Sequence, residues 1–269
     1  MNSPRVAFIT AIYGNYEATC KPFVKQSVDA DFICFTNCQN IQENGWILDR
    51  TPYHELSPSP LDTENQHNSL KNNQHTFNIA KYYKQAFLNI ERLQNYDVVI
   101  WLDGTVEIVN PHTAEWILHN IKDKKIITWE HEKRYGSLLS EVNSSIVDRY
   151  ISTFWFGQAQ PMQDVKAQYR SYLEDGYDEG YWETIDASRE NLGVWLTCFI
   201  AFDIHSEEVR KFLDLWYLQT LTYTTQDQIG FPYVVQKTGL IPYTLPDAEI
   251  KGAAPHNKTD FYIKHSHGK

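Results

Sequence analysis

An acidic residue that directly follows an apolar stretch is the first candidate for chemistry in this sequence. Asp103 comes after residues 96–102 (YDVVIWL) and is itself followed by Gly104. Ligands of open α/β sheets bind beyond the carboxyl ends of the strands, so a carboxylate at this position is expected at the mouth of a cleft. Its oxygen atoms suit Mg²⁺ or Mn²⁺ held against a diphosphate. The alternative is a turn in which Asp-Gly only ends the strand.

Two lysines lie on the helix that is predicted before this strand. Lys81 and Lys84 are three residues apart within residues 77–93, where apolar residues recur at helical spacing. Ammonium groups on neighbouring helix faces can bind the phosphate oxygens of one ligand. The alternative is a pair of solvated surface lysines.

Two further polar groups follow apolar or turn segments. Glu130, His131 and Arg134 come after the apolar residues 125–128 and have the residue types of a polar cleft edge, or of a surface ion-pair patch. Asp227 and Gln228 precede an apolar helix, where the alternative role is helix capping.

Other reaction classes lack their sequence motifs here. The chain has no Walker-type phosphate loop, no G-x-G-x-x-G after a strand, no G-x-S-x-G elbow and no H-E-x-x-H. These absences disfavour kinases, dehydrogenases, serine hydrolases and zincins. The cysteines are too few for a disulfide scaffold, and the spacing of Cys34 and Cys38 lacks the second pair that a zinc site needs, so we expect them to be reduced and mostly buried. They are Cys20, Cys34, Cys38 and Cys198.

Composition limits the partners. The 269 residues include 24 Lys and Arg against 34 Asp and Glu, which gives a net charge of −10 and disfavours nucleic-acid binding. Apolar runs fall short of the roughly 20 residues that a membrane helix needs. The N-terminal residues also lack the pattern of a secretory signal. We therefore expect a cytoplasmic protein without a transmembrane segment, for which peripheral membrane contact is left open.

Alternating strand and helix patterns predict the fold class. Strands are predicted at residues 6–12, 31–36, 96–102, 125–128 and 195–202, and helices at 77–93, 113–121, 141–150, 163–174 and 207–218. Elements interleaved in this way predict an α/β/α sandwich on a mostly parallel central sheet. We see no repeat or linker, so a single domain is expected.

Three segments interrupt this pattern. Residues 54–76 and the acidic residues 175–193 are predicted to be surface loops, with a substrate lid or cleft wall as the alternative. The tail from residue 253 contains His256, His265 and His267, and it either frays or folds back over a site.

Several segments, read in order, resemble a known family. They are residues 9–16 (ITAIYGNY), 31–36 (DFICFT) with Gly45-Trp46, 78–84 (NIAKYYK), 96–104 (YDVVIWLDG), 129–134 (WEHEKR) and 226–234 (QDQIGFPYV). Together they resemble the glycosyltransferase-like family that includes plant pectic mucilage hexosyltransferases. The similarity spans roughly residues 9–240.

The resemblance implies a GT-A fold, in which an acid after a central strand holds a metal on the diphosphate of a nucleotide sugar. Asp103 matches the family acid, and the helix motif is matched by Asn78, Lys81 and Lys84. Asp227 and Gln228 match an Arg-Asp-Gln block, in which this chain has Gln226 in place of Arg. The acidic motif is a single Asp-Gly instead of D-x-D. A second metal ligand then comes from elsewhere, such as a C-terminal histidine, or the metal is loosely held or absent.

The implied function is transfer of a hexose from a nucleotide-diphosphate sugar, such as a UDP-sugar, to a glycan or glycolipid acceptor in polysaccharide biosynthesis. Mn²⁺ or Mg²⁺ is the expected cofactor. The implied domain comprises a nucleotide-binding part at about 1–130, an acceptor-side part at about 131–250 and a tail at 251–269. Alternatives are a non-catalytic carbohydrate- or nucleotide-sugar-binding protein and a sugar nucleotidyltransferase.

Roles are assigned to site residues on the same basis. The nucleotide and its diphosphate are assigned to Thr10, Ala11, Tyr13, Asn78, Lys81, Lys84, Asp103 and Gly104. Asp227 is the first choice for the catalytic group, with His131 and Glu130 in reserve. Arg134, Gln228 and Trp182 are assigned to substrate, and Asp103 and His265 to the metal. Tyr177, Tyr181 and Trp182 are expected to be exposed and able to stack on a sugar.

Overall fold

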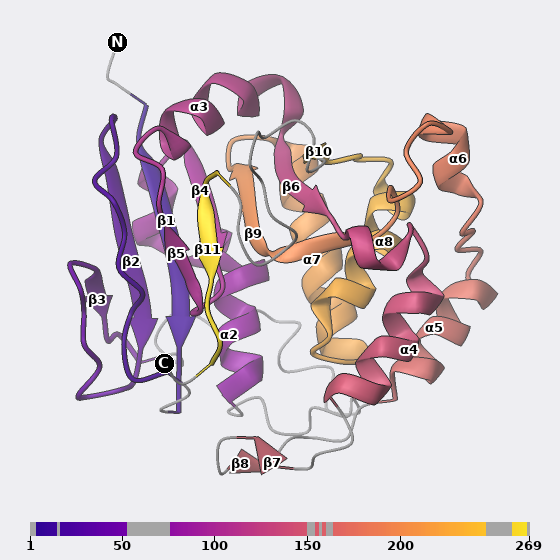
Figure 1. Cartoon of the computed structure of the whole chain (residues 1–269), viewed down its shortest axis with the longest axis horizontal. Coiled ribbons are helices and arrows are strands. Elements are labelled where there is room, and N and C mark those ends of the chain that lie inside the picture. The colour runs from indigo at the N-terminus through magenta and orange to yellow at the C-terminus, as the bar shows by residue number, and fades with distance from the viewer. Residues whose placement is uncertain are drawn as a thin grey trace.

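The computed structural model contains a seven-stranded mixed sheet between layers of helices (Figure 1). The described residues are 4–14, 17–52, 76–149, 154–155, 158–159, 164–245 and 260–267. The predicted loop at 54–76 therefore lies outside them, apart from residue 76, which begins a helix. Among the described residues, no helix has both the length and the apolar character required to cross a bilayer.

The central sheet is mostly parallel, as predicted. Its strand order is β10-β6-β9-β4-β1-β2-β3, and only β9 runs antiparallel to its neighbours β4 and β6. The strands are β1 (Val6–Ile12), β2 (Ala30–Thr36), β3 (Ile47–Asp49), β4 (Val98–Leu102), β6 (Ile126–Glu130), β9 (Trp195–Asp203) and β10 (Tyr243–Leu245). Every residue of the central strand β4 is buried, which explains its continuous apolar sequence.

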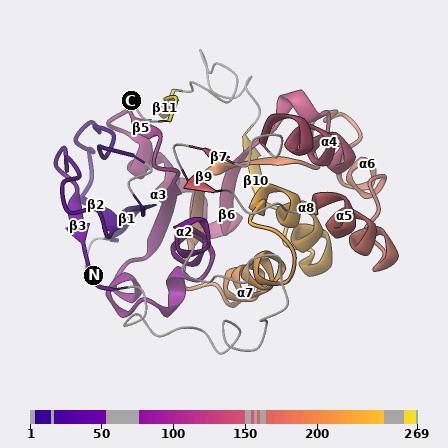
Figure 2. The same ribbon diagram turned by 90° about the horizontal axis from the view of Figure 1, so that it is seen from below.

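Helices cover both faces of the sheet. One face carries α2 (Thr76–Gln85), α7 (Glu207–Thr222) and α8 (Asp227–Thr238), which lie side by side in Figure 2. The helices α4 (Leu138–Arg149) and α5 (Val165–Glu174) pack against α8. The other face carries α3 (Thr113–Lys124). The four cysteines are buried and free, as predicted.

The C-terminal residues 262–267 fold back onto the domain, one of the two outcomes expected for the tail. Strand β11 (Tyr262–Lys264), yellow in Figure 1, pairs antiparallel with β5 (Val106–Ile108). This small sheet places the end of the chain beside the segment that follows β4. A separate two-stranded ribbon is formed by β7 (Phe154–Trp155) and β8 (Gln158–Ala159).

The helix predicted at residues 77–93 is shorter in the structure. After α2 ends at Gln85, the chain forms two 3₁₀ turns, Phe87–Asn89 and Glu91–Asn95. These turns bury Phe87, Leu88 and Leu93. The apolar spacing therefore reports burial correctly, although tertiary packing changes the type of turn.

The expectation that the acidic segment 175–193 exposes its aromatic rings is wrong. This segment contains α6 (Tyr181–Asp186), and Tyr177 and Trp182 are only 4% and 3% exposed. The ring of Trp182 packs edge-on against Trp195, with centroids 5.2 Å apart. Average polarity misled the sequence interpretation, because the charged residues face solvent while the aromatic rings join the core.

We expect Gly193→Ala to destabilise the fold more than Gly176→Ala. Both glycines have positive φ, so both substitutions strain the backbone by about 1–3 kcal/mol. A Cβ at Gly193 would also lie 2.5 Å from Cδ1 of Trp182 and overlap the carbonyl oxygen of Gly136, whereas nothing lies within 4 Å at Gly176. Urea denaturation measures both free energies of unfolding. Equal losses would contradict the tight packing of Trp182.

Candidate functional site

The candidate site lies where the strand order of the sheet changes direction. From β1, the chain proceeds to β2 and β3 on one side, whereas β4 pairs with β1 on the other side. Ligands of open α/β sheets bind at such a switch point, beyond the carboxyl ends of the strands. Asp103 and Gly104 follow β4 there, and a Cβ on Gly104 would be only 3.2 Å from Cγ1 of Ile12 at the end of β1. The Asp-Gly turn thus lies directly against both strand ends.

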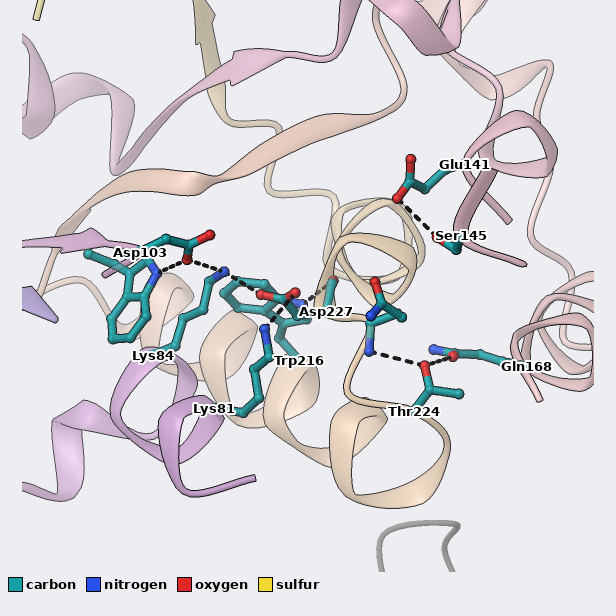
Figure 3. A network of polar contacts seen from close by, with 11 residues as sticks. Lys81, Lys84, Asp103, Glu141, Ser145, Gln168, Trp216, Thr224 and Asp227 are labelled. Carbon is teal, nitrogen blue, oxygen red and sulfur yellow. Dashed lines mark hydrogen bonds and ion pairs between the residues drawn. The ribbon is translucent and has the colours of Figure 1, made fainter. Parts of the chain in front are cut away.

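The side chain of Asp103 is partly exposed beyond the end of β4. Its side chain is 34% accessible, so it is neither packed in the interior nor remote from the site. Oδ1 accepts hydrogen bonds from Nε1 of Trp101 at 2.9 Å and from Nζ of Lys84 at 3.4 Å (Figure 3). Oδ2 makes no hydrogen bond or ion pair within the described part of the chain.

Lys84 is the most deeply buried charge of the site. Its side chain is 1% exposed, and its ammonium group forms ion pairs with Asp103 and with Oδ2 of Asp227. The same nitrogen lies 5.6 Å and 5.8 Å from the ring centres of Trp101 and Trp216, within the range of cation–π attraction. Lysine is rarely buried in this way unless it is paired.

Lys81 completes a four-residue group, here called the lysine–aspartate cluster (Lys81, Lys84, Asp103 and Asp227). Its Nζ lies 2.9 Å from Oδ1 of Asp227. Figure 3 shows the two lysines extending from α2 toward carboxylates that come from β4 and α8. The structure therefore brings together four residues that were predicted from three separate segments.

Aromatic contacts hold α2 in position. The hydroxyl groups of Tyr13 and Tyr83 lie 2.8 Å apart, and the ring of Tyr83 stacks on Phe35. Burial raises the pKa of Tyr13 to about 12, so this pair stays uncharged at neutral pH. The hydrogen bond ties the end of β1 to the helix that carries both lysines.

Asp227 is positioned from the other side by α7. Nε1 of Trp216 donates a hydrogen bond of 2.9 Å to the backbone oxygen of Asp227. Asp227 is also the first residue of α8, where the helix dipole favours a negative charge. Both interactions hold the carboxylate against the lysines.

Electrostatics fix the charge states of the cluster. Burial acts to raise the pKa of Asp103, but three ammonium groups hold it well below its usual range. In order of effect, they are Lys84, Lys264 and Lys81. Burial also acts to raise the pKa of Asp227, but Lys81 and Lys84 lower it below its usual value.

The two lysines respond differently. Burial lowers the pKa of Lys84, but the carboxylates of Asp103 and Asp227 raise it above its usual value. For Lys81 burial dominates, and its pKa is lowered. Asp227 is therefore ionised, nearly buried and paired with two cations, so its carboxylate accepts a proton less readily than an unpaired one.

A resident metal site is not preformed among the described residues, which contain no group of three or more histidine, cysteine or acidic side chains suited to an ion. The predicted second ligand, His265, instead places Nε2 2.6 Å from Oε2 of Glu107. The exposed oxygen of Asp103 still fits an ion shared with a substrate, because Mg²⁺ commonly takes one or two carboxylates and completes its shell with phosphates and water.

The other residues assigned to the nucleotide shape the strand ends. Thr10 and Tyr13 are buried in β1 and just after it, and Ala11 packs partly against the core. The buried Oγ1 of Thr10 makes no hydrogen bond in the described part of the chain. Asn78 lies in α2, but its side chain is outside the described residues. Gln228 is buried next to Asp227 in α8.

The residues predicted around the end of β6 form a second group. Glu130 pairs with Arg189 at 2.7 Å, and Arg134 pairs with the buried Glu141 at 2.6 Å. His131 is buried, and its backbone nitrogen donates to Val194. The strand register puts Glu130 roughly 14 Å from Asp103, two strands away. This group and the buried Trp182 are thus separate from the lysine–aspartate cluster.

Sequence reasoning missed Gln85. Its side chain is completely buried, and neither amide atom finds a hydrogen-bond partner among the described residues. It lies one turn after Lys81 on the same helix face. A buried amide without partners costs about 1–3 kcal/mol. The sequence could have indicated it, because Gln85 follows Lys81 by four residues and such residues share a helix face.

Comparisons with known proteins add structural likenesses only. No family model and no curated protein matches the sequence. Among solved structures, the WbbM bifunctional glycosyltransferase is 10% identical, with 87% of this chain covered, 38% of that chain spanned and a TM-score of 0.46.

Two further solved structures resemble the chain. Mouse xyloside xylosyltransferase 1 is 7% identical, with coverage of 90% and 84% of the two chains and a TM-score of 0.46. Core-mannan synthase A from Aspergillus fumigatus, in an Mn/GDP form, is 12% identical, with coverage of 90% and 72% and a TM-score of 0.41. Likenesses of this kind assign no activity to the chain, and the resemblance to the plant family stays a prediction.

The depressed pKa of Asp103 predicts a pH effect on stability. A carboxylate whose pKa is lower in the folded state stabilises the fold above its unfolded pKa, and this contribution is lost as the pH falls. We expect the melting temperature of Asp103→Asn to fall less steeply than that of the wild type as the pH drops below about 4. Circular dichroism at several pH values measures this.

Asp123→Asn is the matched control, because Asp123 is exposed on α3. Its pH profile is expected to follow the wild type. If Asp103→Asn also follows the wild type, the cations do not hold Asp103 as described.

Proposed function

We propose that this protein is a glycosyltransferase of the GT-A type that uses a nucleoside-diphosphate sugar. The observation that carries the proposal is the lysine–aspartate cluster, with Lys84 buried between Asp103 and Asp227 at the switch point of the sheet. Two ammonium groups and an exposed carboxylate oxygen at that place suit a ligand rich in phosphate oxygens. The mostly parallel α/β sheet supports the same class.

The chemistry requires charge stabilisation at the leaving group. In the transfer, the bond between the sugar carbon and the donor phosphate oxygen breaks, and a bond to an acceptor hydroxyl oxygen forms. The electron pair stays on the departing diphosphate, so negative charge grows there. Ammonium groups already fixed near this oxygen stabilise the transition state more than the ground state. Lys81, which is partly exposed, and Lys84 would supply them.

The reaction also needs a counter-charge for the diphosphate, a base for the acceptor, and a donor and an acceptor. A divalent ion held by Asp103 would supply additional positive charge to the diphosphate. The acceptor hydroxyl loses its proton to a base. Asp227 is tied to the lysines, and Glu130 is tied to Arg189 in the separate group at the end of β6, so His131 of that group is the remaining candidate, for an acceptor that extends from the cluster to it. A hexose donor such as a UDP-sugar, and a glycan or glycolipid acceptor in polysaccharide biosynthesis, complete the proposal.

A non-catalytic nucleotide-sugar-binding protein is the second candidate. It is favoured by one observation: both carboxylates of the cluster are already engaged by lysines, so the site is complete for binding without a free base. Both functions require binding of the diphosphate, so binding alone does not distinguish them. Only the enzyme would also hydrolyse the nucleotide sugar or transfer its sugar.

Nucleotide binding tests the shared requirement. We expect UDP or GDP to bind the wild type by calorimetry, and Lys81→Met to weaken binding about tenfold or more through loss of one charge-assisted contact. Lys125→Met is the control, because Lys125 pairs with Glu208 on another face. Failure of UDP, GDP and ADP to bind, with or without Mn²⁺, would remove the proposal. Release of the free nucleotide from the corresponding sugars then separates enzyme from binder.

Metal binding is expected to depend on the nucleotide. Because Asp103 is one carboxylate among several cations, Mn²⁺ alone is expected to leave the melting temperature unchanged, whereas Mn²⁺ with UDP or GDP raises it above the nucleotide alone. Asp103→Asn should abolish only this additional increase. Tight binding of Mn²⁺ without nucleotide would contradict a shared ion.

A further inference from the structure

The C-terminal strand carries a lysine toward the cluster. In the register of β11 with β5, Lys264 lies opposite Val106, and Tyr262 lies opposite Ile108. The backbone nitrogen of His265 donates to the oxygen of Thr105 at 2.9 Å. Residues 262–265 therefore run alongside the segment that begins at the Asp-Gly turn, although the two are far apart in sequence.

Strand alternation places Lys264 on the inner face of this small sheet. Side chains two residues apart share a face, so Lys264 lies on the same face as Tyr262. Tyr262 is fully buried, and its hydroxyl contacts Sγ of Cys198 at 3.8 Å. The backbone oxygen of Cys198 in turn accepts the hydrogen bond from the nitrogen of Asp103. The inner face thus points toward the turn that carries Asp103.

The positive charge of Lys264 affects the pKa of two residues, Asp103 and Cys198. It is the second cation, after Lys84, among those that lower the pKa of Asp103. It also opposes the rise that burial causes in the pKa of Cys198. Lys264 itself is half-buried.

Lys264 changes the net charge of the site. Within the lysine–aspartate cluster, two ammonium groups and two carboxylates cancel. Adding Lys264, whose charge acts on Asp103, leaves these five residues with one net positive charge. The nearest acid of the same sheet, Glu107, lies opposite Ile263 on the outer face and is engaged by His265. The charge balance around the Asp-Gly turn therefore favours an anionic ligand.

Two histidine contacts hold the segment in place. His265 meets Glu107 at 2.6 Å, and Nδ1 of His267 lies 2.8 Å from Oε1 of Glu17. Glu17 is itself buried, and its Cγ would be 3.6 Å from a Cβ on Gly104. Both contacts anchor the chain end beside the Asp-Gly turn, so Lys264 is delivered by an ordered strand.

We propose that Lys264 is a phosphate-binding residue of the site, which the C-terminal strand supplies as a third cation for the terminal phosphate of a nucleoside diphosphate. This inference rests on the proposed function, because it names a further residue for the same ligand. It gives β11 a role in binding the leaving group in addition to its role in the fold.

Lys264→Gln is the direct test, with Lys264→Arg and Lys122→Gln as controls. Lys122 is exposed on α3, on which no site residue lies. Calorimetry measures the dissociation constants of the nucleoside diphosphate that the wild type binds and of the matching monophosphate. We expect Lys264→Gln to weaken the diphosphate about tenfold and the monophosphate much less, since one charged contact to the terminal phosphate is lost. Both controls should bind as the wild type does.

The outcomes separate this inference from the proposed function. If Lys264→Gln binds the diphosphate like the wild type while Lys81→Met does not, the role of Lys264 is overturned and the nucleotide site stands. An equal loss for monophosphate and diphosphate would also overturn it, because Lys264 would then act on the fold or on another part of the ligand. A wild type that binds no nucleoside diphosphate would remove both. Melting temperatures verify that each variant is folded.

Discussion

The ammonium group of Lys84, buried between two carboxylates, is the interaction on which the arrangement of this protein depends. A buried charge is unfavourable unless it is paired, and breaking such a pair costs about 3–5 kcal/mol. Its partners come from different layers: Asp103 follows the central strand β4, and Asp227 begins α8. The lysine itself stands on α2. These three elements must therefore dock together for any one of the charges to be tolerated, so the same contacts that assemble the helix layer on the sheet also build the site.

This constraint connects fold and proposed function. Charges that are fixed before a ligand arrives need little reorganisation when negative charge develops on a leaving group. Trp101 and Trp216 contribute by surrounding Lys84 with aromatic faces, and each also donates its indole hydrogen to the neighbouring acidic residue. The cluster is neutral by itself, which lets it stay buried. Its exposed edge, at Oδ2 of Asp103, is where an anionic ligand and a shared cation would meet the protein.

Local sequence patterns predicted the parts of the site that depend on one element. The β-branched run before Asp103 predicts a buried central strand, and the spacing of Lys81 and Lys84 predicts that both can face one partner; both features are present. The pairing of the lysines with Asp227 depends on how α7 and α8 dock on α2, which no local pattern encodes. Burial of Trp182 was missed for the same reason, because the polarity of its segment hides a ring that packs on Trp195. The place of residues 262–267 beside Asp103 is likewise set by strand pairing between distant segments.

The central claim is that the lysine–aspartate cluster receives the diphosphate of a nucleotide sugar. A crystal structure of the protein with bound UDP or GDP tests this most directly. The account predicts that oxygen atoms of the diphosphate lie within hydrogen-bonding distance of Nζ of Lys81 or Lys84, next to the carboxylate of Asp103. A nucleotide whose diphosphate lies elsewhere, with the cluster unchanged and distant from it, would contradict the account.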